Sequence, residues 1–135
     1  MKALSLRQPY VELILQGKKT MESRPWNTKF RGEFLIHTAM AISEPACRRF
    51  GFDPKTMDRG RIVGKAVLVD VKEYTTDEDY LKDSDKHLGS KQGLEEFGWI
   101  GKKKYGFVLE NVKRVKPIEV KGQLGFFEVD IKIKD

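Results

Sequence analysis

A short segment near the start of the chain, from Gly17 to Trp26, carries the side chains best suited to chemistry. If a strand begins near Thr20, Glu22 and Arg24 point to the same face, because side chains alternate along a strand. Lys19 then stands at the mouth of that strand. An arginine binds phosphate or a base edge through two hydrogen bonds, and a carboxylate orients it or accepts from an exocyclic amine. The alternative is an exposed ion pair that contributes little to stability.

Two tryptophans stand close to basic residues. Trp26 follows the Arg24-Pro25 pair, and Trp99 lies between glycines, ahead of three consecutive lysines. A tryptophan at the mouth of a cleft stacks on a base and contributes roughly 1–3 kcal/mol to binding. The alternative for both residues is partly buried packing.

Other candidates for catalysis or metal binding are few. The chain has one cysteine, Cys47, and two histidines, His37 and His87. One cysteine excludes an internal disulfide framework and a multi-cysteine zinc site, and it fits a reducing compartment. We expect His37, inside an apolar strand, to lie in the core, and Cys47 to be a packing residue; a Cys–His nucleophilic pair is the weaker alternative. Dinucleotide, nucleoside triphosphate, esterase and zincin motifs are absent, so no cofactor and no metal are predicted.

Composition favours one folded, basic unit. The 135 residues match the usual size of one domain, so we expect a single domain over residues 1–135. Hydrophobic residues make up 39% and charged residues 34%, a mixture too apolar for disorder and too charged for a membrane span. The net charge of +6 favours a polyanionic partner. The first residues lack the apolar run of a signal peptide, and we therefore expect a cytoplasmic protein.

The charges are unevenly distributed. Residues 1–35 carry a net +4 and residues 101–121 a net +5, whereas residues 75–88 carry −3. If the two basic segments are neighbours in the fold, they form one positive face opposite an acidic flap. The alternative is that each run is a solvated surface, as charge runs usually are.

The periodicity of apolar residues predicts short strands and two early helices. Helices are expected from Pro9 to Gly17 and from Ser43 to Gly51, because proline starts and glycine ends a helix. Residues 75 to about 97 are expected to be a loop with short helical turns. The expected strands are Lys2–Leu6, Thr20–Arg24, Glu33–Ala39, Arg61–Tyr74 with a bulge at Gly64, Tyr105–Val115, an edge piece Pro117–Val120, and a closing strand from Phe126 through Ile131 to Lys132. This order indicates an α+β, mainly β, barrel and not a doubly wound sheet.

The pattern Gly17-x-Lys19-x-x-Glu22-x-Arg24 resembles the G-x-K-x-x-E-x-R motif of the ASCH domain, a branch of the PUA-like superfamily. The resemblance covers most of the chain, and residues 75–100 match least. The further blocks that resemble this family are Leu4–Tyr10, Glu33–Ala39, Tyr105–Val112, Pro117, Lys121-Gly122 and Phe126–Val129.

This resemblance implies a PUA-like pseudo-barrel of about six strands with short inserted helices, and a cleft beside the first helix that carries the motif. It also implies an RNA-binding protein that recognises RNA or a modified base in that cleft. Arg24 is expected to read the base and Lys104 to contact phosphate. The residues assigned to nucleic-acid binding are Gln8, Lys18, Lys19, Glu22, Arg24, Trp26, Lys103 and Lys104.

The alternative is a hydrolase with Lys19 and Glu22 as its catalytic pair. In the family that this chain resembles, one branch of small bacterial members hydrolyses the amide of acetylated cytidine with the motif lysine and a threonine at the place of Glu22, and other members have been described as ribonucleases. Here a carboxylate replaces that hydroxyl, and Thr20 lies two positions upstream on the same face. A lysine also needs a pKa lowered by burial to act near neutral pH. A third alternative is a protein-interaction domain with a vestigial cleft.

Overall fold

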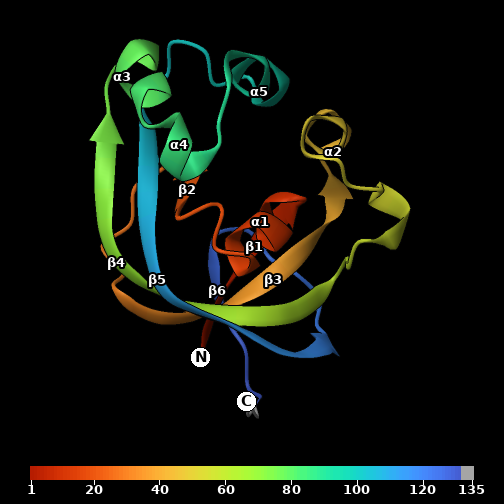
Figure 1. The fold of residues 1–135 in the computed structure, drawn as a ribbon. Coiled ribbons are helices and arrows are strands. Elements are labelled where there is room, and N and C mark those ends of the chain that lie inside the picture. Colours follow the sequence, from red (N-terminus) through yellow and green to blue (C-terminus); the bar gives the residue numbers. More distant parts are fainter. Residues whose placement is uncertain (132–135) are drawn as a thin grey trace.

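The computed structural model describes residues 1–131, which form a curved six-stranded sheet with short helices along it (Figure 1). None of the helices described within these residues has the length and apolar character needed to cross a membrane. The elements in chain order are β1 Lys2–Gln8, α1 Tyr10–Leu15, β2 Met21–Arg24, β3 Gly32–Ile42, α2 Glu44–Phe50, a 3₁₀ turn Pro54–Thr56, β4 Arg61–Tyr74, α3 Asp77–Lys82, α4 Ser84–His87, α5 Lys91–Phe97, β5 Lys104–Glu119 and β6 Phe126–Glu128.

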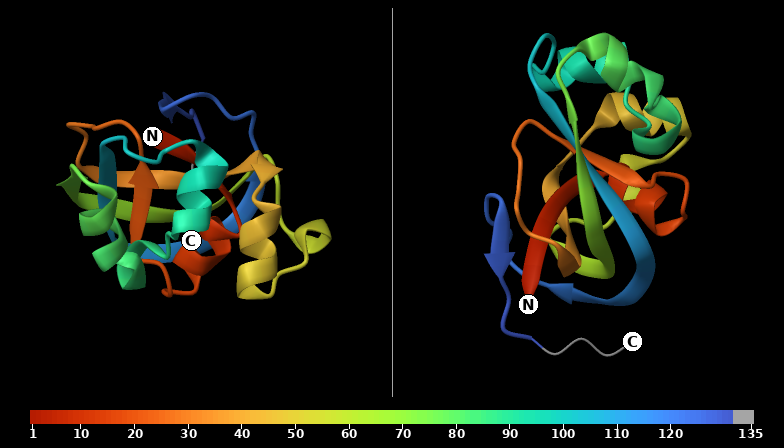
Figure 2. Two further views of the ribbon diagram at one scale, coloured as in Figure 1. Left: turned by 90° about the horizontal axis from the view of Figure 1, so that it is seen from above. Right: turned by 90° about the vertical axis from the view of Figure 1, so that its left-hand side faces the viewer.

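The strands follow the order β2-β5-β4-β3-β1-β6 across the sheet. β1 and β3 are parallel, and every other neighbouring pair is antiparallel. The helices α3, α4 and α5 gather at one end of the sheet in Figure 1 and in the right-hand view of Figure 2. The architecture is therefore α+β and mainly β, as the sequence predicts.

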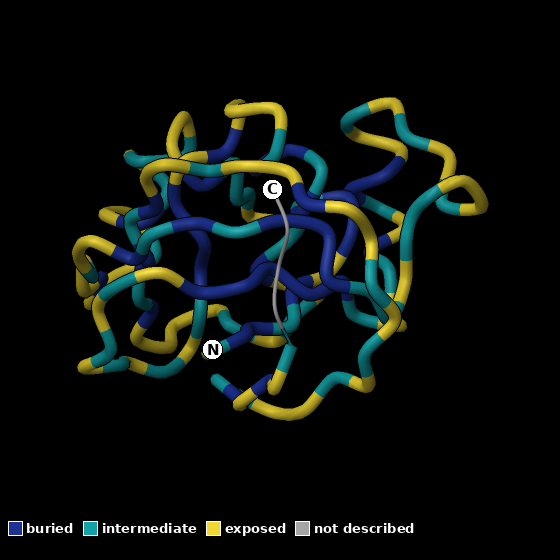
Figure 3. The backbone as a smooth tube through the Cα atoms, turned by 90° about the horizontal axis from the view of Figure 1, so that it is seen from below, coloured by how far each residue is buried: buried dark blue, intermediate teal, exposed yellow. Residues whose placement is uncertain are grey.

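The core lies inside the curve of the sheet (Figure 3). Leu4, Leu6, Phe34, Ile36 and Phe107 are buried there and pack in one cluster. Their alternation along the strands places one apolar face inward, and this burial is the main force that stabilises the curved sheet.

Local signals in the sequence explain both early helices and the bulge. The Ser43 hydroxyl accepts a hydrogen bond from the Ala46 N–H at the start of α2, and Gly51 ends that helix in the left-handed region at φ 77°. At Gly64 the register of β4 shifts against both neighbouring strands. A Cβ at Gly64 would lie 2.6 Å from the Leu15 side chain and 2.9 Å from the Lys113 carbonyl oxygen, so only glycine fits. The predicted bulge and helices are confirmed.

The short helical turns expected after residue 75 are present as α3, α4 and α5, and the Thr76 and Ser90 hydroxyls accept from the backbone at the starts of α3 and α5. Two expectations need correction. The separate edge piece at Pro117 is continuous with the preceding strand, and both belong to β5. The closing strand ends at Glu128, so the alternation seen as far as Ile131 is not strand; Lys132, the last residue of that expectation, lies outside the described residues.

Candidate functional site

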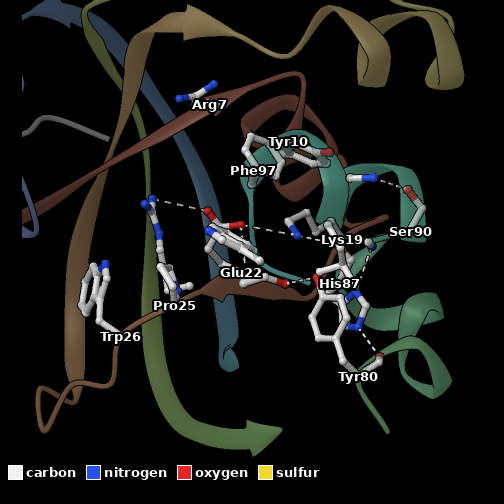
Figure 4. Close-up of a pocket in the computed structure, with 16 residues that line it drawn as sticks. Arg7, Tyr10, Lys19, Glu22, Pro25, Trp26, Tyr80, His87, Ser90 and Phe97 are labelled. Atoms are coloured by element: carbon white, nitrogen blue, oxygen red, sulfur yellow. Dashed lines mark hydrogen bonds and ion pairs between the residues drawn. The ribbon is translucent and has the colours of Figure 1, made fainter. Parts of the chain in front are cut away.

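A cavity of about 280 Å³ lies between β2 and the three helices at the end of the sheet (Figure 4). Segments far apart in the chain meet here, because α3 to α5 fold back over the start of β2. The lining residues are Arg7, Tyr10, Lys19, Glu22, Ser23, Arg24, Pro25, Trp26, Tyr80, His87, Gly89, Ser90, Gly93, Leu94, Phe97 and Trp99.

The three charged motif residues meet at the cavity wall. Lys19 Nζ lies 3.4 Å from Glu22 Oε1, and Arg24 Nη2 lies 3.5 Å from Glu22 Oε2. Their side chains are only 2%, 10% and 21% exposed, respectively. The prediction that Glu22 and Arg24 share a face is confirmed, and the alternative of an exposed ion pair is wrong.

Lys19 is held from both sides. α1 ends just before it, and the N–H groups of Lys18 and Lys19 both donate to the Leu13 carbonyl, which turns the chain inward. The ammonium group then donates to the His87 carbonyl oxygen at 2.5 Å. Burial lowers the pKa of Lys19, and the neighbouring Glu22 carboxylate opposes this shift. The burial that acid–base chemistry by a lysine requires is therefore present.

Arg24 is less available than the sequence suggests. Its Nη2 donates to the Ser5 carbonyl oxygen at 2.7 Å, and its Nε is buried with no hydrogen-bond partner among residues 1–131. Burial lowers the pKa of Arg24, although an arginine stays charged in proteins. Arg24 lines the cavity, but part of its guanidinium fork is already used to join β2 to β1.

Two hydroxyl groups that the sequence analysis did not identify lie beside the charged cluster. Ser23 Oγ and Tyr80 Oη are 2.7 Å apart, and the Tyr80 ring stacks on His87 with centroids 3.9 Å apart. His87 Nε2 donates to the Tyr80 carbonyl oxygen. Burial raises the pKa of Tyr80 to about 12 and lowers the pKa of His87 to about 4, so both side chains are neutral at pH 7. The sequence signal that could have located Tyr80 is Thr76, because a threonine there caps the start of α3, the helix that carries Tyr80.

Aromatic rings form the remaining walls. Trp26 packs edge-on against Phe107 and Phe126, with centroids 5.4 and 6.1 Å away. Phe97 lies 5.2 Å from Trp99, and both line the cavity from the side of α5. Each tryptophan is half-buried, so each packs against the protein and also presents a face to the cavity.

Four of the predicted binding residues lie away from the cavity lining. Gln8 is buried, and its Oε1 accepts from the Glu12 N–H at the start of α1. Lys18 is exposed, and exposed Lys103 pairs with Glu73 at 3.2 Å. The cavity therefore joins Lys19, Glu22, Arg24 and Trp26 from the predicted set, and it adds Arg7, Ser23, Tyr80 and Phe97.

The prediction that Lys104 contacts phosphate is wrong. Lys104 is fully buried, forms an ion pair with Asp77, and donates to the Lys102 carbonyl oxygen at 2.6 Å. Within the acidic segment of residues 75–88, Asp77 pairs with Lys104 of β5 and Asp83 pairs with Lys72 of β4. The sequence shows the charges of both segments but not that they meet.

The other candidate groups are structural. His37 is buried, with Nδ1 3.0 Å from Ser5 Oγ and Nε2 2.6 Å from the Val120 carbonyl oxygen. Cys47 is buried in α2, where burial raises the pKa of its thiol. Both packing interpretations are confirmed. Within residues 1–131 no three His, Cys, Asp or Glu side chains lie together as a metal site requires.

Comparison with known proteins identifies the fold around this cavity. The model of the ASCH domain family matches residues 4–119. A crystal structure of ASCH from Zymomonas mobilis superposes with a TM-score of 0.69 at 15% identity and covers 96% of this chain and 87% of that one. Structures of a tyrosine-to-phenylalanine and a serine-to-alanine mutant of the same protein each give a TM-score of 0.68 at 15% identity, with 96% of this chain covered and 89% and 87% of theirs. None of the curated proteins matches the chain in sequence.

Proposed function

The chain belongs to the ASCH domain family, and from that premise and the geometry of the cavity we propose that it binds single-stranded RNA and receives one unstacked base between β2 and α5. A cavity of about 280 Å³ is at the lower end of small-molecule sites, which suits one base and its sugar better than a dinucleotide. Sequence-specific RNA recognition usually targets bases splayed out of the stack.

The observation that carries the proposal is the Glu22 carboxylate in the cavity wall. Lys19 and Arg24 flank it, and the Ser23 N–H donates to Oε1 at 3.2 Å. These contacts hold the carboxylate in one orientation. A fixed carboxylate oxygen accepts a hydrogen bond from an exocyclic amine, which is how Glu and Asp recognise cytosine N4.

The walls and the net charge support the same ligand. The rings of Trp26, Phe97 and Trp99 offer apolar faces against which a base packs, and such stacking tolerates any base. The net charge of +6 attracts the phosphate backbone and makes binding depend on salt. The aromatic walls would supply contact area and Glu22 the discrimination.

The test is a titration of labelled RNAs at about 50 mM and about 200 mM salt, the range over which phosphate contacts weaken measurably. We expect single-stranded RNA to bind better than a duplex of the same composition, because the duplex keeps its bases stacked. We also expect the four homopolymers to differ in affinity. Equal affinity for duplex and single strands, with no base preference, would reduce the cavity to part of a basic surface. Absence of binding at low salt would refute the proposal.

A second candidate function, hydrolysis of a nucleoside amide or an RNA phosphodiester, is favoured by the burial of Lys19. The lowered pKa brings its ammonium group closer to a neutral, proton-accepting form, although Glu22 opposes that. The paired hydroxyls of Ser23 and Tyr80 supply, on neighbouring residues, the oxygen nucleophile that Glu22 does not provide.

This candidate is tested by incubating the protein with acetylated cytidine and with single-stranded RNA. We expect product from the wild type and from Lys18→Met, an exposed neighbouring lysine, but not from Lys19→Met, with far-ultraviolet circular dichroism as the check of folding. Equal product from both variants would place the activity elsewhere.

A further inference from the structure

Arg7 is the charged side chain of the cavity to which the fold gives no hydrogen-bond acceptor. It lies in β1 and is exposed at the cavity edge. Its guanidinium lies 5.3 Å from the centre of the Phe97 ring, and it makes no hydrogen bond or ion pair with any residue from 1 to 131. All five of its N–H donors are therefore available to a ligand.

The surroundings of Arg7 hold an excess of positive charge. Lys19 and Arg24 share the single carboxylate of Glu22, and none is left for Arg7. Arg7 is also close enough to Arg24 that its charge adds to burial in lowering the pKa of Arg24. The nearby Glu96 carboxylate accepts instead from the Ser43 hydroxyl at 2.9 Å. Three cations, Arg7, Lys19 and Arg24, face the single carboxylate of Glu22 in the cavity lining, and this excess of positive charge leaves its edge ready for an anion.

The position of Arg7 suits a phosphate rather than a buried anion. Figure 4 shows Arg7 above Glu22, whereas Lys19 and Tyr80 lie on the other side of Glu22. Arg7 is exposed, and both Lys19 and Tyr80 are buried. A base that reaches Glu22 leaves its sugar and phosphate near the opening, where solvent also reaches. A guanidinium binds phosphate through two parallel hydrogen bonds. Because Arg7 already stacks on the Phe97 ring, its side chain loses less conformational entropy when it binds.

We propose, on the basis of the proposed function, that Arg7 binds the phosphate of the nucleotide whose base occupies the cavity, so that the ligand class is nucleotides and not free nucleosides. The phosphate is either the monoester of a free nucleotide or the diester of an RNA chain. Both present two oxygens to the guanidinium fork. Arg24 has the lesser part in this recognition, because its Nη2 is already bonded to Ser5.

The experiment measures binding of the four ribonucleosides and of their 5′- and 3′-monophosphates by calorimetry, with wild type, Arg7→Ala and Arg7→Lys. In the wild type we expect the phosphate to tighten binding about tenfold or more, as hydrogen bonds to charged groups do. Arg7→Ala should remove that advantage and leave nucleoside affinity within about twofold. Arg7→Lys should restore only part of it, since a lysine lacks the planar fork. Arg48→Ala is the matched control, because Arg48 is exposed on α2 and lines neither the cavity nor its edge.

A second arm separates the two sources of phosphate. A single-stranded trinucleotide is compared with its analogue whose linkages are uncharged methylphosphonates. If the diester is the ligand, the wild type binds the analogue more weakly than the native trinucleotide. Arg7→Ala then binds the two trinucleotides equally well.

The outcomes separate this inference from the proposed function. If nucleosides bind wild type as tightly as monophosphates, and the methylphosphonate analogue as tightly as RNA, the inference is overturned while base binding stands. An equal loss for nucleosides and nucleotides in Arg7→Ala also overturns it, because Arg7 then acts only by supporting Phe97. If no nucleoside, nucleotide or RNA binds, the proposed function fails and the inference with it.

Discussion

Two lysines within residues 1–131 are almost completely buried, and they make the same kinds of contact in two different regions. Lys19, at the cavity, contacts the Glu22 carboxylate and the His87 carbonyl oxygen. Lys104, at the start of β5, contacts the Asp77 carboxylate and the Lys102 carbonyl oxygen. Each lysine ties a helix of the 75–100 segment to the sheet.

The two carboxylates distinguish the regions. Asp77 also accepts from the Gly101 N–H, at 3.1 and 2.9 Å to its two oxygens, and it does not line the cavity. The Glu22 oxygens lie 3.4 and 3.5 Å from their cations and form part of the cavity wall. A buried ion pair is therefore not in itself a sign of a site. The pair at Lys104 joins α3 to β5 away from the cavity, whereas the pair at Lys19 forms part of the cavity wall.

The largest expected effect is on stability, from Lys104→Ala. Removing one partner of a buried pair leaves the other unpaired, and removing a large buried side chain leaves a void. Because the Asp77 side chain is 29% exposed, water compensates part of this, and we expect a loss of roughly 2–4 kcal/mol in the free energy of unfolding by urea. RNA affinity of the folded variant should stay within about twofold. A strong loss of affinity at unchanged stability would return Lys104 to the binding surface.

The second prediction separates the two regions by pH. The pKa of His87 is about 4 in the folded protein against an ordinary 6.5, so as pH falls the unfolded chain takes up the proton first. The wild type should therefore lose stability between pH 6.5 and 4, by up to roughly 3 kcal/mol, relative to His87→Phe.

The Asp77 region should behave differently over the same range. Its hydrogen bond with Lys104 lowers the pKa of Asp77 below 3.8, so the stability it contributes is present above pH 3.8 and is lost only as pH falls through the lower folded value. If the free energy of unfolding changes with pH from 7 to 4 in the same way for wild type and His87→Phe, the lowered pKa of His87 is contradicted.

The third prediction replaces the carboxylate of each buried ion pair by the corresponding amide. Glu22→Gln should weaken binding of the preferred RNA about tenfold, the effect of one lost base contact, and should reduce the differences between homopolymers. Asp77→Asn should leave RNA affinity unchanged and lower the free energy of unfolding by about 1–2 kcal/mol. If both variants lose affinity equally, the cavity has no special part in binding.

The smallest effects are expected from exposed lysines outside the cavity. Lys18→Ala should reduce the dependence of log affinity on log salt for long RNA by about one unit, as the loss of one phosphate contact does. Lys103→Ala should change it less, because Glu73 already pairs with Lys103. Neither variant should alter binding of a mononucleotide, and a change there would extend the site beyond the cavity.

Much of the fold could be predicted because its signals are local. Capping residues such as Ser43, terminating glycines such as Gly51, and apolar alternation act within a few positions, and the elements they define are present. The common face of Glu22 and Arg24 follows from the same alternation.

What covers that face could not be predicted, because it depends on contacts between distant segments. Alternation in β5 says that Lys104 and Lys103 point oppositely, but not that α3 brings Asp77 to the first of them. In the same way, Tyr80 reaches Ser23 only through the packing of helices whose own apolar pattern is weak. Arg7 gave no signal of its own, because a charged residue near a strand end is ordinarily solvated.

The pairing of β2 sets the order in which the molecule can assemble. Met21 lies opposite Val108 and Arg24 opposite Tyr105, so the strand that carries the motif has no hydrogen-bonding neighbour until β5 exists. Such pairings between segments far apart in the chain form late in folding. A nascent chain interrupted before Tyr105 would hold the complete G-x-K-x-x-E-x-R motif and yet lack the strand with which β2 pairs.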